Sequence, residues 1–321
     1  MTRSVSIAMA TCNGARYLQE QLDSFVCQTH QPDELVVTDD GSTDETLQIL
    51  ERFQAGAPFA VRVDRNEARL GVARNFERAM SLCSGDIIFL SDQDDVWFPH
   101  KIETVVGEFE RAGSIYVVIN DQLITDGALR SSGVTKLENV LSMGMNESAF
   151  RTGCCTAVAR CWTAVALPIP DHSTHDVWIN GLSELLGARR VLRQPLQYYR
   201  RHGGNASDWL ASRAGRVFLF DVIWLHRLKD ARDGWQRYRQ LKHAYLARLR
   251  ERETMLKDFG LEHAAETAIL LLQQEISVSE ARTRLVEVPR WRRGPGLLRF
   301  LLDGGYGHFA GWKSAVKDLI R

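Results

Sequence analysis

Residues Asp86–Asp95 read DIIFLSDQDD. The apolar run Ile87–Leu90 has the length and composition of a buried β-strand, and it leads straight into the acidic cluster Asp92–Asp95. Three carboxylates within four residues repel one another, so a bound cation would stabilise them. Ligands that are all oxygen suit Mg²⁺ or Mn²⁺. The alternative is a solvated acidic turn in front of a helix, where acidic residues are favourable in any case.

The same arrangement, an apolar strand that ends in polar residues or glycine, occurs twice upstream. Val5–Ala10 runs into Thr11–Gly14, and Leu35–Thr38 runs into Asp39–Gly41. Apolar residues at helical spacing separate the strands. The sequence predicts strands at Val5–Ala10, Leu35–Thr38, Phe59–Val63, Asp86–Leu90 and Ile115–Ile119, with helices from Tyr17, after Ser42, at Val72–Leu82 and from Lys101.

Strands that alternate with helices predict an α/β fold with a mostly parallel sheet and helices on both of its faces. Ligands of such sheets bind beyond the carboxyl ends of the strands. We therefore expect the loops Thr11–Gly14, Asp39–Gly41 and Asp92–Asp95 to converge on one site. Ser42 with Glu45 three residues later matches a capping box, which predicts that a helix starts there.

The pattern changes after Asn120, and beyond Asp208 it becomes long, charged and helical. We place a domain boundary there, with an α/β domain at residues 1–207 and a smaller helical region at residues 208–321. The elements expected in this half are strands at Cys154–Ala159, Val191–Arg193 and Leu196–Arg201, and helices at Val177–Leu186, Val217–Leu225, Ala244–Phe259 and Ala264–Leu285.

Composition indicates an ordinary globular protein, with 45% hydrophobic residues and 40 basic residues balancing 40 acidic ones. This balance gives no footprint of nucleic-acid binding. Charge is uneven, however, because the residues from Asp208 onward hold 21 Lys and Arg against 14 Asp and Glu. The basic region would suit an anionic lipid or an anionic acceptor, and a solvated helical surface explains it equally well.

Cysteine usage and hydropathy favour a cytoplasmic protein. None of the six cysteines forms a C-x-x-C pair, so we expect no zinc site and a reducing compartment. Met1–Ala10 lacks the long apolar core of a signal peptide, and no stretch approaches the ~18 apolar residues of a spanning helix.

The C-terminal tail mixes basic and aromatic residues, as segments that lie in a membrane interface do. They are Arg290–Arg293, Leu297–Leu302, Phe309, Trp312 and Lys313. Peripheral attachment to the inner face of the cell membrane is one hypothesis. An amphipathic helical cap that packs on the sheet domain is the other.

Several motifs, taken in order, resemble the family 2 glycosyltransferases, and most closely the bacterial rhamnosyltransferase-like members. The resemblance covers about Ser4 to Ser207 and implies the GT-A fold, a nucleotide-binding sheet domain. The motifs are Ala10-Thr11-Cys12-Asn13-Gly14, Asp39 to Asp44 (DDGSTD), Ser91 to Trp97 (SDQDDVW) and His175 to Trp178 (HDVW). A closing segment at Tyr199–Asn205 resembles "Y-R-x-H-x-x-N".

The resemblance implies a role for each matching residue. Asp40 would accept a hydrogen bond from the imide N–H of a pyrimidine, which an ionised carboxylate can do. Asp94 would bind the metal, His202 would ligate the metal or hydrogen-bond the diphosphate, and Arg200 and Arg201 would clamp phosphate. The residues implied to bind the donor are Thr11, Asn13, Asp40, Arg69, Asn75, Asp92 and Arg201. A turn role for Asp40 and an exposed surface charge for Arg69 remain alternatives.

Asp176 is the residue that the resemblance implies as the catalytic base. The acceptor hydroxyl must lose a proton as it attacks, which calls for a carboxylate within hydrogen-bond reach. The divalent metal, Mg²⁺ or Mn²⁺, would stabilise charge on the leaving diphosphate. Asp176 also heads an amphipathic segment, so a plain helix cap is the competing interpretation.

The hypothesis is therefore an inverting, metal-dependent glycosyltransferase in cell-surface polysaccharide synthesis. It would move a sugar, rhamnose by similarity, from a dTDP- or UDP-linked donor to a saccharide or lipid-linked acceptor. The alternatives are a nucleotidyltransferase, which Ala10–Gly14 disfavours with one Gly and no basic residue, and a non-catalytic nucleotide-binding scaffold. No G-x-G-x-x-G follows the first strand, which excludes a dehydrogenase. Whether the chain forms a homodimer stays open.

Overall fold

The computed structural model describes residues 3–111, 113–205, 209–213, 215–217, 231–309 and 311–320. The chain divides into two compact units, residues 1–229 and 230–321. The α/β domain expected at residues 1–207 falls inside the first unit, and a boundary at residue 208 stays a proposal. Each unit is considered by itself.

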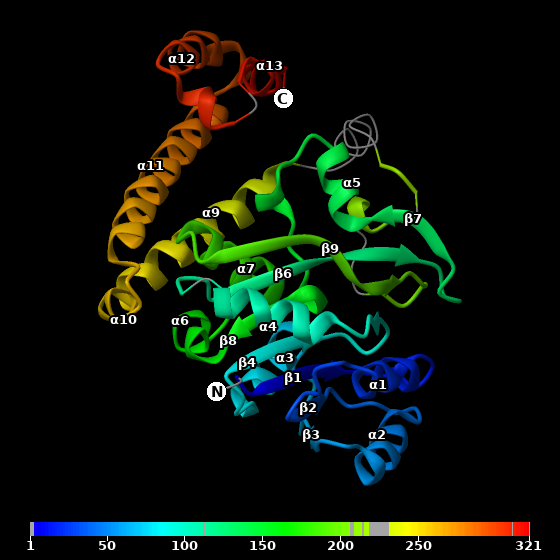
Figure 1. Ribbon diagram of the computed structural model, residues 1–321. Coiled ribbons are helices and arrows are strands. Elements are labelled where there is room, and N and C mark those ends of the chain that lie inside the picture. The colour runs from blue at the N-terminus through cyan, green and yellow to red at the C-terminus, as the bar shows by residue number, and fades with distance from the viewer. Residues whose placement is uncertain are drawn as a thin grey trace. The chain divides into compact units, whose positions relative to one another are not determined.

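The first unit is built on one mixed sheet in the order β3-β2-β1-β4-β8-β6-β9-β5, with β7 paired to β6 (Figure 1). Strands β1 to β4 run parallel to one another, β6 and β9 are parallel, and β8 runs antiparallel between β4 and β6. The strands are β1 Val5–Thr11, β2 Glu34–Asp39, β3 Ala60–Arg65, β4 Ile87–Ser91, β5 Val96–Trp97, β6 Val117–Thr125, β7 Ser131–Thr135, β8 Thr156–Ala159 and β9 Arg189–Arg200. The predicted α/β fold is confirmed.

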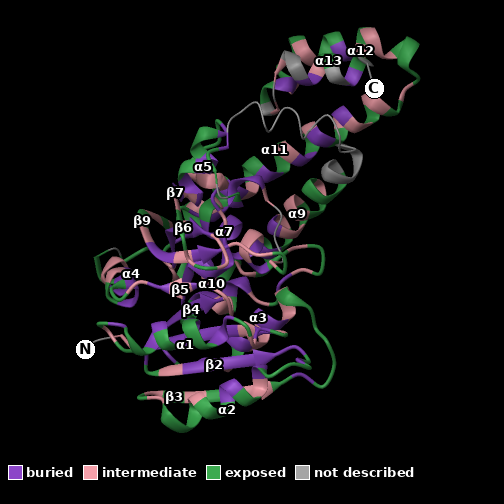
Figure 2. Ribbon diagram, turned by 90° about the vertical axis from the view of Figure 1, so that its right-hand side faces the viewer, coloured by how far each residue is buried: buried purple, intermediate pink, exposed green. Residues whose placement is uncertain are grey.

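Helices cover both faces of this sheet. Residues of alternate strand positions point to opposite faces, so Ile7 packs in a core with Leu22 of α1 and Val105 of α4, while α3 packs on the other side of β1 and β2. The helices are α1 Leu18–Val26, α2 Thr46–Gly56, α3 Val72–Leu82, α4 Lys101–Arg111, α5 Lys136–Ser142, α6 Thr163–Ala166 and α7 His175–Leu185. In Figure 2 the central strands are mostly buried, as their continuous apolar runs predict.

The predicted capping box at Ser42 is wrong. Helix α2 begins at Thr46 with Glu45 as its N-cap, and the Glu45 side chain makes no capping hydrogen bond. The Ser42 hydroxyl instead donates to Asp39 Oδ2 at 2.5 Å, because the buried Asp39 carboxylate organises the turn after β2. A tertiary partner has taken the hydroxyl that local capping would use.

Two predicted strands, Val191–Arg193 and Leu196–Arg201, form the single strand β9. Pro195, between the two predicted strands, lacks the backbone N–H that a sheet ladder uses. The register between β6 and β9 shifts around Asp121, opposite Pro195, and this irregularity accommodates the proline. The strand expected at Cys154–Ala159 starts two residues later, after a 3₁₀ turn at Gly153–Cys155. Residues 218–225 of the helix expected from Val217 lie outside the described residues.

The second unit is helical, as predicted. Its buried residues include Leu256, Ala268 and Leu272, and Arg282 makes a buried ion pair with Asp318 at 2.7 and 3.0 Å. Its elements are α9 Ala231–Glu251, α10 Glu253–Asp258, α11 Glu262–Glu287, α12 Arg290–Leu302, α13 Trp312–Ile320 and a 3₁₀ turn at Gly305–His308. Across the described ranges, no helix is both long and apolar enough to cross a bilayer.

Candidate functional site

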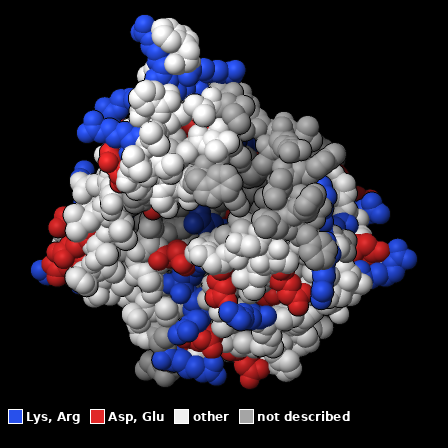
Figure 3. Space-filling view, turned by 90° about the horizontal axis from the view of Figure 1, so that it is seen from above, with Lys and Arg blue, Asp and Glu red and all other residues white. Residues whose placement is uncertain are grey.

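A cleft of about 980 Å³ opens where β1, β2 and β4 end, the edge at which parallel sheets bind ligands. Figure 3 shows a hollow on this unit with both acidic and basic side chains beside it. Seven of the predicted site residues line the cleft: Thr11, Asp40, Arg69, Asn75, Asp92, Asp94 and Asp176. Asn13, Arg201 and His202 are not among its lining residues.

The ends of β1 and β2 are joined by side chains. Thr11 Oγ1 donates to Asp39 Oδ2 at 2.9 Å, and Asp39 also accepts from the backbone N–H of Ser42 at 2.8 Å. The exposed Asn13, with φ of 50°, accepts from the Thr43 N–H at 2.8 Å. Asn13 thus holds the two loops together, and its contact with a donor stays a prediction.

Asp40 anchors the segment that leads into α3. Its Oδ1 accepts from Leu70 N–H at 2.6 Å and from the Asn66 amide at 2.9 Å, and its Oδ2 accepts from Gly71 N–H at 2.9 Å. Burial alone would raise the pKa of Asp40, but these donors hold it below its ordinary value. Asp40 is therefore an ionised acceptor, and among the described residues one lone pair of its Oδ2 has no hydrogen-bond donor.

Asn75 and Arg69 complete this side of the cleft. The Asn75 amide donates to Thr38 O at 2.8 Å and its Oδ1 accepts from Asn66 at 2.9 Å, so its polar atoms serve the fold. Arg69 is exposed and donates to Cys12 Sγ at 2.9 Å. Of the two, Arg69 has the guanidinium that could reach a ligand.

The acidic loop is aimed by Gln93, whose amide pairs reciprocally with the backbone of Cys12 at 2.9 and 3.0 Å. Asp95 turns inward, where it is buried and accepts from the Gln197 amide at 2.7 Å and from Arg200 N–H at 3.2 Å. Asp92 and Asp94 line the cleft. Burial, and then the negative charge of Asp94, raise the pKa of Asp92 to about 7.

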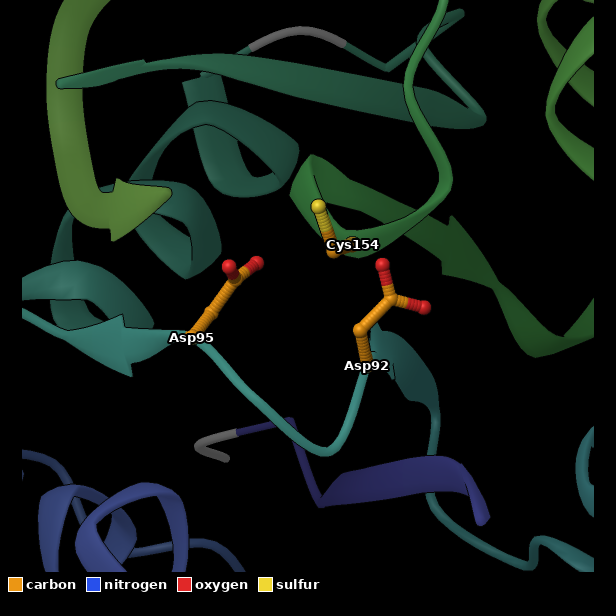
Figure 4. Close-up of side chains that lie close together, drawn as sticks. All are labelled: Asp92, Asp95 and Cys154. Atoms are coloured by element: carbon orange, nitrogen blue, oxygen red, sulfur yellow. The ribbon is translucent and has the colours of Figure 1, made fainter. Parts of the chain in front are cut away.

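Two groups of side chains in this loop could hold a cation. In Figure 4, Asp92, Asp95 and Cys154 face one another, with one ligand atom from each within 4.8 Å of the others. A hydrogen bond with Cys155, together with burial, raises the pKa of the Cys154 thiol well above its ordinary value. A neutral thiol is a poor ligand for Mg²⁺ or Mn²⁺, so this group fits those ions badly.

The second group is Asp94 with His202. Oδ2 of Asp94 lies 2.8 Å from Nε2 of His202, and Gly204 N–H donates to Nδ1 at 3.1 Å. Because Nδ1 accepts, the proton of a neutral imidazole lies on Nε2, between the ring and the carboxylate. An oxygen and a nitrogen converge on one point, so these two residues fit a divalent cation that would replace the proton.

Arg200 is a structural residue and not the phosphate clamp that the sequence suggested. Each guanidinium nitrogen has a protein acceptor: Asp94 O at 2.9 Å, Gly127 O at 2.8 Å and the Glu20 carboxylate. Arg201 donates to the Tyr199 hydroxyl at 3.3 Å, and its predicted contact with the donor stays a prediction.

Asp176 lies in the first turn of α7 and lines the same cleft as the strand ends. The N-cap of α7 is Thr174, so Asp176 does not occupy the capping position that the alternative interpretation required. It is half-buried, and its Oδ1 accepts from Val177 N–H at 2.8 Å. After burial and the charge of Asp94, the charge of Asp176 also raises the pKa of Asp92, while the cation Lys136 lowers it, so the two carboxylates act on each other within the cleft.

Residues 6–160, the segment that contains β1 to β4 and the acidic loop, match the model of the family described as Glycosyl transferase family 2. Residues 6–160, a little under half of the chain, therefore resemble glycosyl transferase family 2.

Relatives extend this likeness over part of the chain. An uncharacterized glycosyltransferase of Nostoc is 28% identical over 63% of this chain and 66% of its own length. The dTDP-rhamnosyl transferase RfbG of Shigella flexneri is 37% identical over 30% of this chain and 35% of its own length. The chain therefore spans less than two thirds of the length of either.

The fold continues beyond the family 2 segment. The crystal structure of S. aureus TarS residues 1–349 in complex with UDP-GlcNAc covers 98% of this chain and 89% of its own, with a TM-score of 0.58. The two sequences are 16% identical, so this likeness concerns the fold alone. It supports a GT-A-like sheet domain followed by helices.

Several residues that line the cleft carried no recognisable signal in the sequence. His175 was noted only as part of the HDVW motif, yet it is buried, stacks on Phe76 with centroids 4.1 Å apart, and has no hydrogen-bond partner for either ring nitrogen among the described residues. Lys136, Arg151 and Trp209 line the cleft from segments outside the motifs. Only tertiary packing brings them there.

Gly153 is required by this packing, and Gly153→Ala is expected to destabilise the protein. A Cβ at Gly153 would lie 2.0 Å from His175 Nε2, and the His175 ring is buried and stacked on Phe76, which limits how far it can shift. Overpacking of this kind costs roughly 1–3 kcal/mol, which a urea unfolding midpoint would detect. Gly56→Ala is the matched control, since its Cβ meets nothing within 4 Å.

The double variant tests the reason for that loss. In a His175→Ala background the ring is absent, so adding Gly153→Ala should lower the unfolding midpoint much less than it does in the natural chain. Equal losses in the two backgrounds would show that contact with His175 is not the cause.

Proposed function

We propose that this chain is an inverting, metal-dependent glycosyltransferase that moves a sugar from a nucleoside-diphosphate donor to an acceptor hydroxyl. The observation that carries the proposal is one cleft lined both by the β1, β2 and β4 strand ends and by Asp176 of α7. A nucleotide side and a carboxylate base are what displacement at a sugar carbon needs in one cavity. In this proposal the chain serves cell-surface polysaccharide synthesis.

The nucleoside would bind at the ends of β1 and β2. Asp40, ionised and with a free lone pair on Oδ2, can accept a hydrogen bond from the N–H of a pyrimidine base. The Thr11 hydroxyl donates a hydrogen bond to Asp39, so the hydroxyl oxygen of Thr11 can accept a hydrogen bond from the ligand. Arg69 is the exposed cation on this side for a phosphate oxygen.

Asp94 and His202 would hold the divalent cation, with Asp92 beside them. When bound, the cation would stabilise the negative charge that develops on the leaving diphosphate. Asp95 is withdrawn from this role by its bonds to Gln197 and Arg200. The protein thus keeps two carboxylates, Asp92 and Asp94, at the cleft and uses the third to fix the loop.

Asp176 would accept the proton of the attacking hydroxyl. Its Oδ1 is held by Val177 N–H, and the described residues provide no donor for Oδ2. Attack on the face opposite the leaving diphosphate, in a single displacement, inverts the configuration of the sugar carbon.

Calorimetric titration with dTDP and UDP, each with and without Mn²⁺, tests this assignment. We expect one diphosphate to bind in a metal-dependent manner. The 37% sequence identity to the dTDP-rhamnosyl transferase RfbG over 102 residues favours dTDP, and therefore a rhamnosyl donor. Failure of folded protein to bind either diphosphate would contradict the proposed donor site.

Helix α12 supports peripheral contact with an anionic membrane, which would suit a lipid-linked acceptor. Trp291, Leu298 and Leu302 are 77%, 58% and 78% exposed, and their spacing of seven and four residues puts them on one face. Exposed Arg290 and Arg292 lie at its start. Apolar residues flanked by arginine fit a surface of anionic headgroups.

Vesicle binding checks this face. We expect the chain to bind phosphatidylglycerol vesicles more tightly than phosphatidylcholine vesicles, and Trp291→Ser with Leu302→Ser to weaken that binding about tenfold or more, because two apolar side chains no longer insert. Leu270→Ser with Leu271→Ser is the matched control, since both leucines are exposed on α11. A homodimer that the first variant dissociates, without vesicle binding, would assign the face to a second copy instead.

A further inference from the structure

Lys136 is a buried cation in the wall of the cleft. It begins α5, and 4% of its surface is exposed. Its Nζ donates to Thr152 Oγ1 at 3.2 Å and lies over the rings of Tyr199 and Trp209, 4.7 and 5.7 Å from their centroids. In the part of the chain that the structure describes, no carboxylate comes within 4.0 Å of Nζ.

This environment leaves the ammonium incompletely paired. An ammonium has three N–H donors, and the protein satisfies one of them. Two aromatic rings stabilise the positive charge in part. The charges of Asp92 and Asp176 act on Lys136 across the cleft, but neither carboxylate bonds to its ammonium. An anion in the cleft would accept from the N–H donors that remain and so complete the site.

Arg151 adds a second cation to the same wall. It is half-buried and lines the cleft, and its neighbour in the chain, Thr152, bonds to Lys136. Its Nε donates to Ser148 O at 3.4 Å, while the described residues provide no acceptor for its two Nη groups. Together Lys136 and Arg151 can donate several hydrogen bonds to one oxyanion, as phosphate sites do.

The sheet order separates this pair from the nucleoside end. Thr11 and Asp40 follow β1 and β2, whereas α5 packs against β6 and Tyr199 belongs to β9. Strands β4 and β8 lie between these two pairs, and β4 carries the acidic loop. An anion beside Lys136 therefore lies on the other side of the acidic loop from the nucleobase, where the acceptor would bind.

We propose that Lys136 and Arg151 bind a phosphate group of the acceptor, and this inference rests on the glycosyltransferase activity proposed above. The acceptor is then a phosphorylated saccharide and not a neutral sugar. Tyr199 and Trp209 supply flat apolar walls against which the face of its sugar ring can pack. The phosphate fixes the acceptor so that its hydroxyl meets Asp176.

The test uses glucose 1-phosphate and glucose, two probes that differ by the phosphate alone. Each is titrated calorimetrically into the full chain with its nucleotide site filled by saturating dTDP or UDP and Mn²⁺. We expect the natural chain to bind glucose 1-phosphate more tightly than glucose. Lys136→Met and Arg151→Met should each weaken that binding about 10- to 100-fold, the loss expected for hydrogen bonds to a charged group. Lys136→Arg should retain it.

Arg69→Met is the matched control, because Arg69 lines the nucleoside side of the same cleft. It should weaken nucleotide binding and leave glucose 1-phosphate binding unchanged. Equal binding of the two sugars, or weakened nucleotide binding in Lys136→Met with glucose 1-phosphate unaffected, would overturn the subsite. Absence of nucleotide binding contradicts the proposed function instead. Glucose 1-phosphate is then titrated into the chain without nucleotide, and weaker binding to Arg151→Met than to the natural chain would still support the phosphate subsite, whereas equal binding would overturn it.

Discussion

Asp176→Asn is expected to lower kcat about 10³-fold, within the range for losing a general base. Asparagine keeps the size of the side chain and can still accept a hydrogen bond from Val177 N–H, as Asp176 Oδ1 does at 2.8 Å. It cannot take up the proton of the acceptor hydroxyl. The measurement is transfer of sugar from the donor identified by titration, with nucleotide binding followed in parallel.

Nucleotide binding separates a catalytic loss from a folding defect. Asp176→Asn should bind dTDP or UDP as the natural chain does, because Asp176 lies on α7 and the nucleoside residues follow β1 and β2. Asp171→Asn is the matched control: this acid is exposed, and its ion pair with Arg74 contributes little at the surface. Unchanged turnover in Asp176→Asn would remove Asp176 as the base.

The second large effect is expected from Asp94→Ala, which should reduce nucleotide binding in Mn²⁺ to the level measured without metal. Asp94 Oδ2 and His202 Nε2 lie 2.8 Å apart and form the pair that fits a divalent cation. Removing the carboxylate leaves the imidazole alone, and even changes to residues that only support ligands cost 10- to 100-fold in metal affinity. Calorimetry with Mn²⁺ and the diphosphate measures both losses.

Two further variants sharpen the assignment. His202→Ala should weaken Mn²⁺ binding and leave metal-independent nucleotide binding in place. Asp86→Asn is the control carboxylate, because Asp86 lies at the opposite end of β4 and bonds to Ser4. If Asp94→Ala keeps full metal dependence while Asp92→Asn loses it, the cation belongs to Asp92 and the pairing with His202 is structural.

The sequence was sufficient for the fold and for the location of the site. Short apolar runs predict buried strands, and the chain places polar residues directly after β1, β2 and β4. Because parallel strands end at the same edge, Thr11, Asp40 and Asp92 had to meet. Local pattern decides such features, since each depends on a few neighbouring residues.

Tertiary structure alone decided what each polar residue in those loops does. Asp94 and Asp95 are adjacent in the sequence, yet Gln197 and Arg200 of β9 bond to Asp95 and turn it inward. Arg200 and Arg201 looked alike in the sequence, but Arg200 donates to the Glu20 carboxylate of α1 and to the backbone carbonyls of Asp94 and Gly127. These partners are far away in the chain, so no local pattern could reveal them.

The cleft wall shows the same limit from the other direction. Lys136 and Arg151 belong to no motif, and nothing in their neighbours marks them as site residues. They line the cleft because α5 and the Gly153–Cys155 turn pack against β6, next to β9. The sequence by itself determined which strand ends line the cleft, because strand ends are set locally. Only the fold decided which charged side chains share that cleft, because burial and pairing depend on partners that folding brings together.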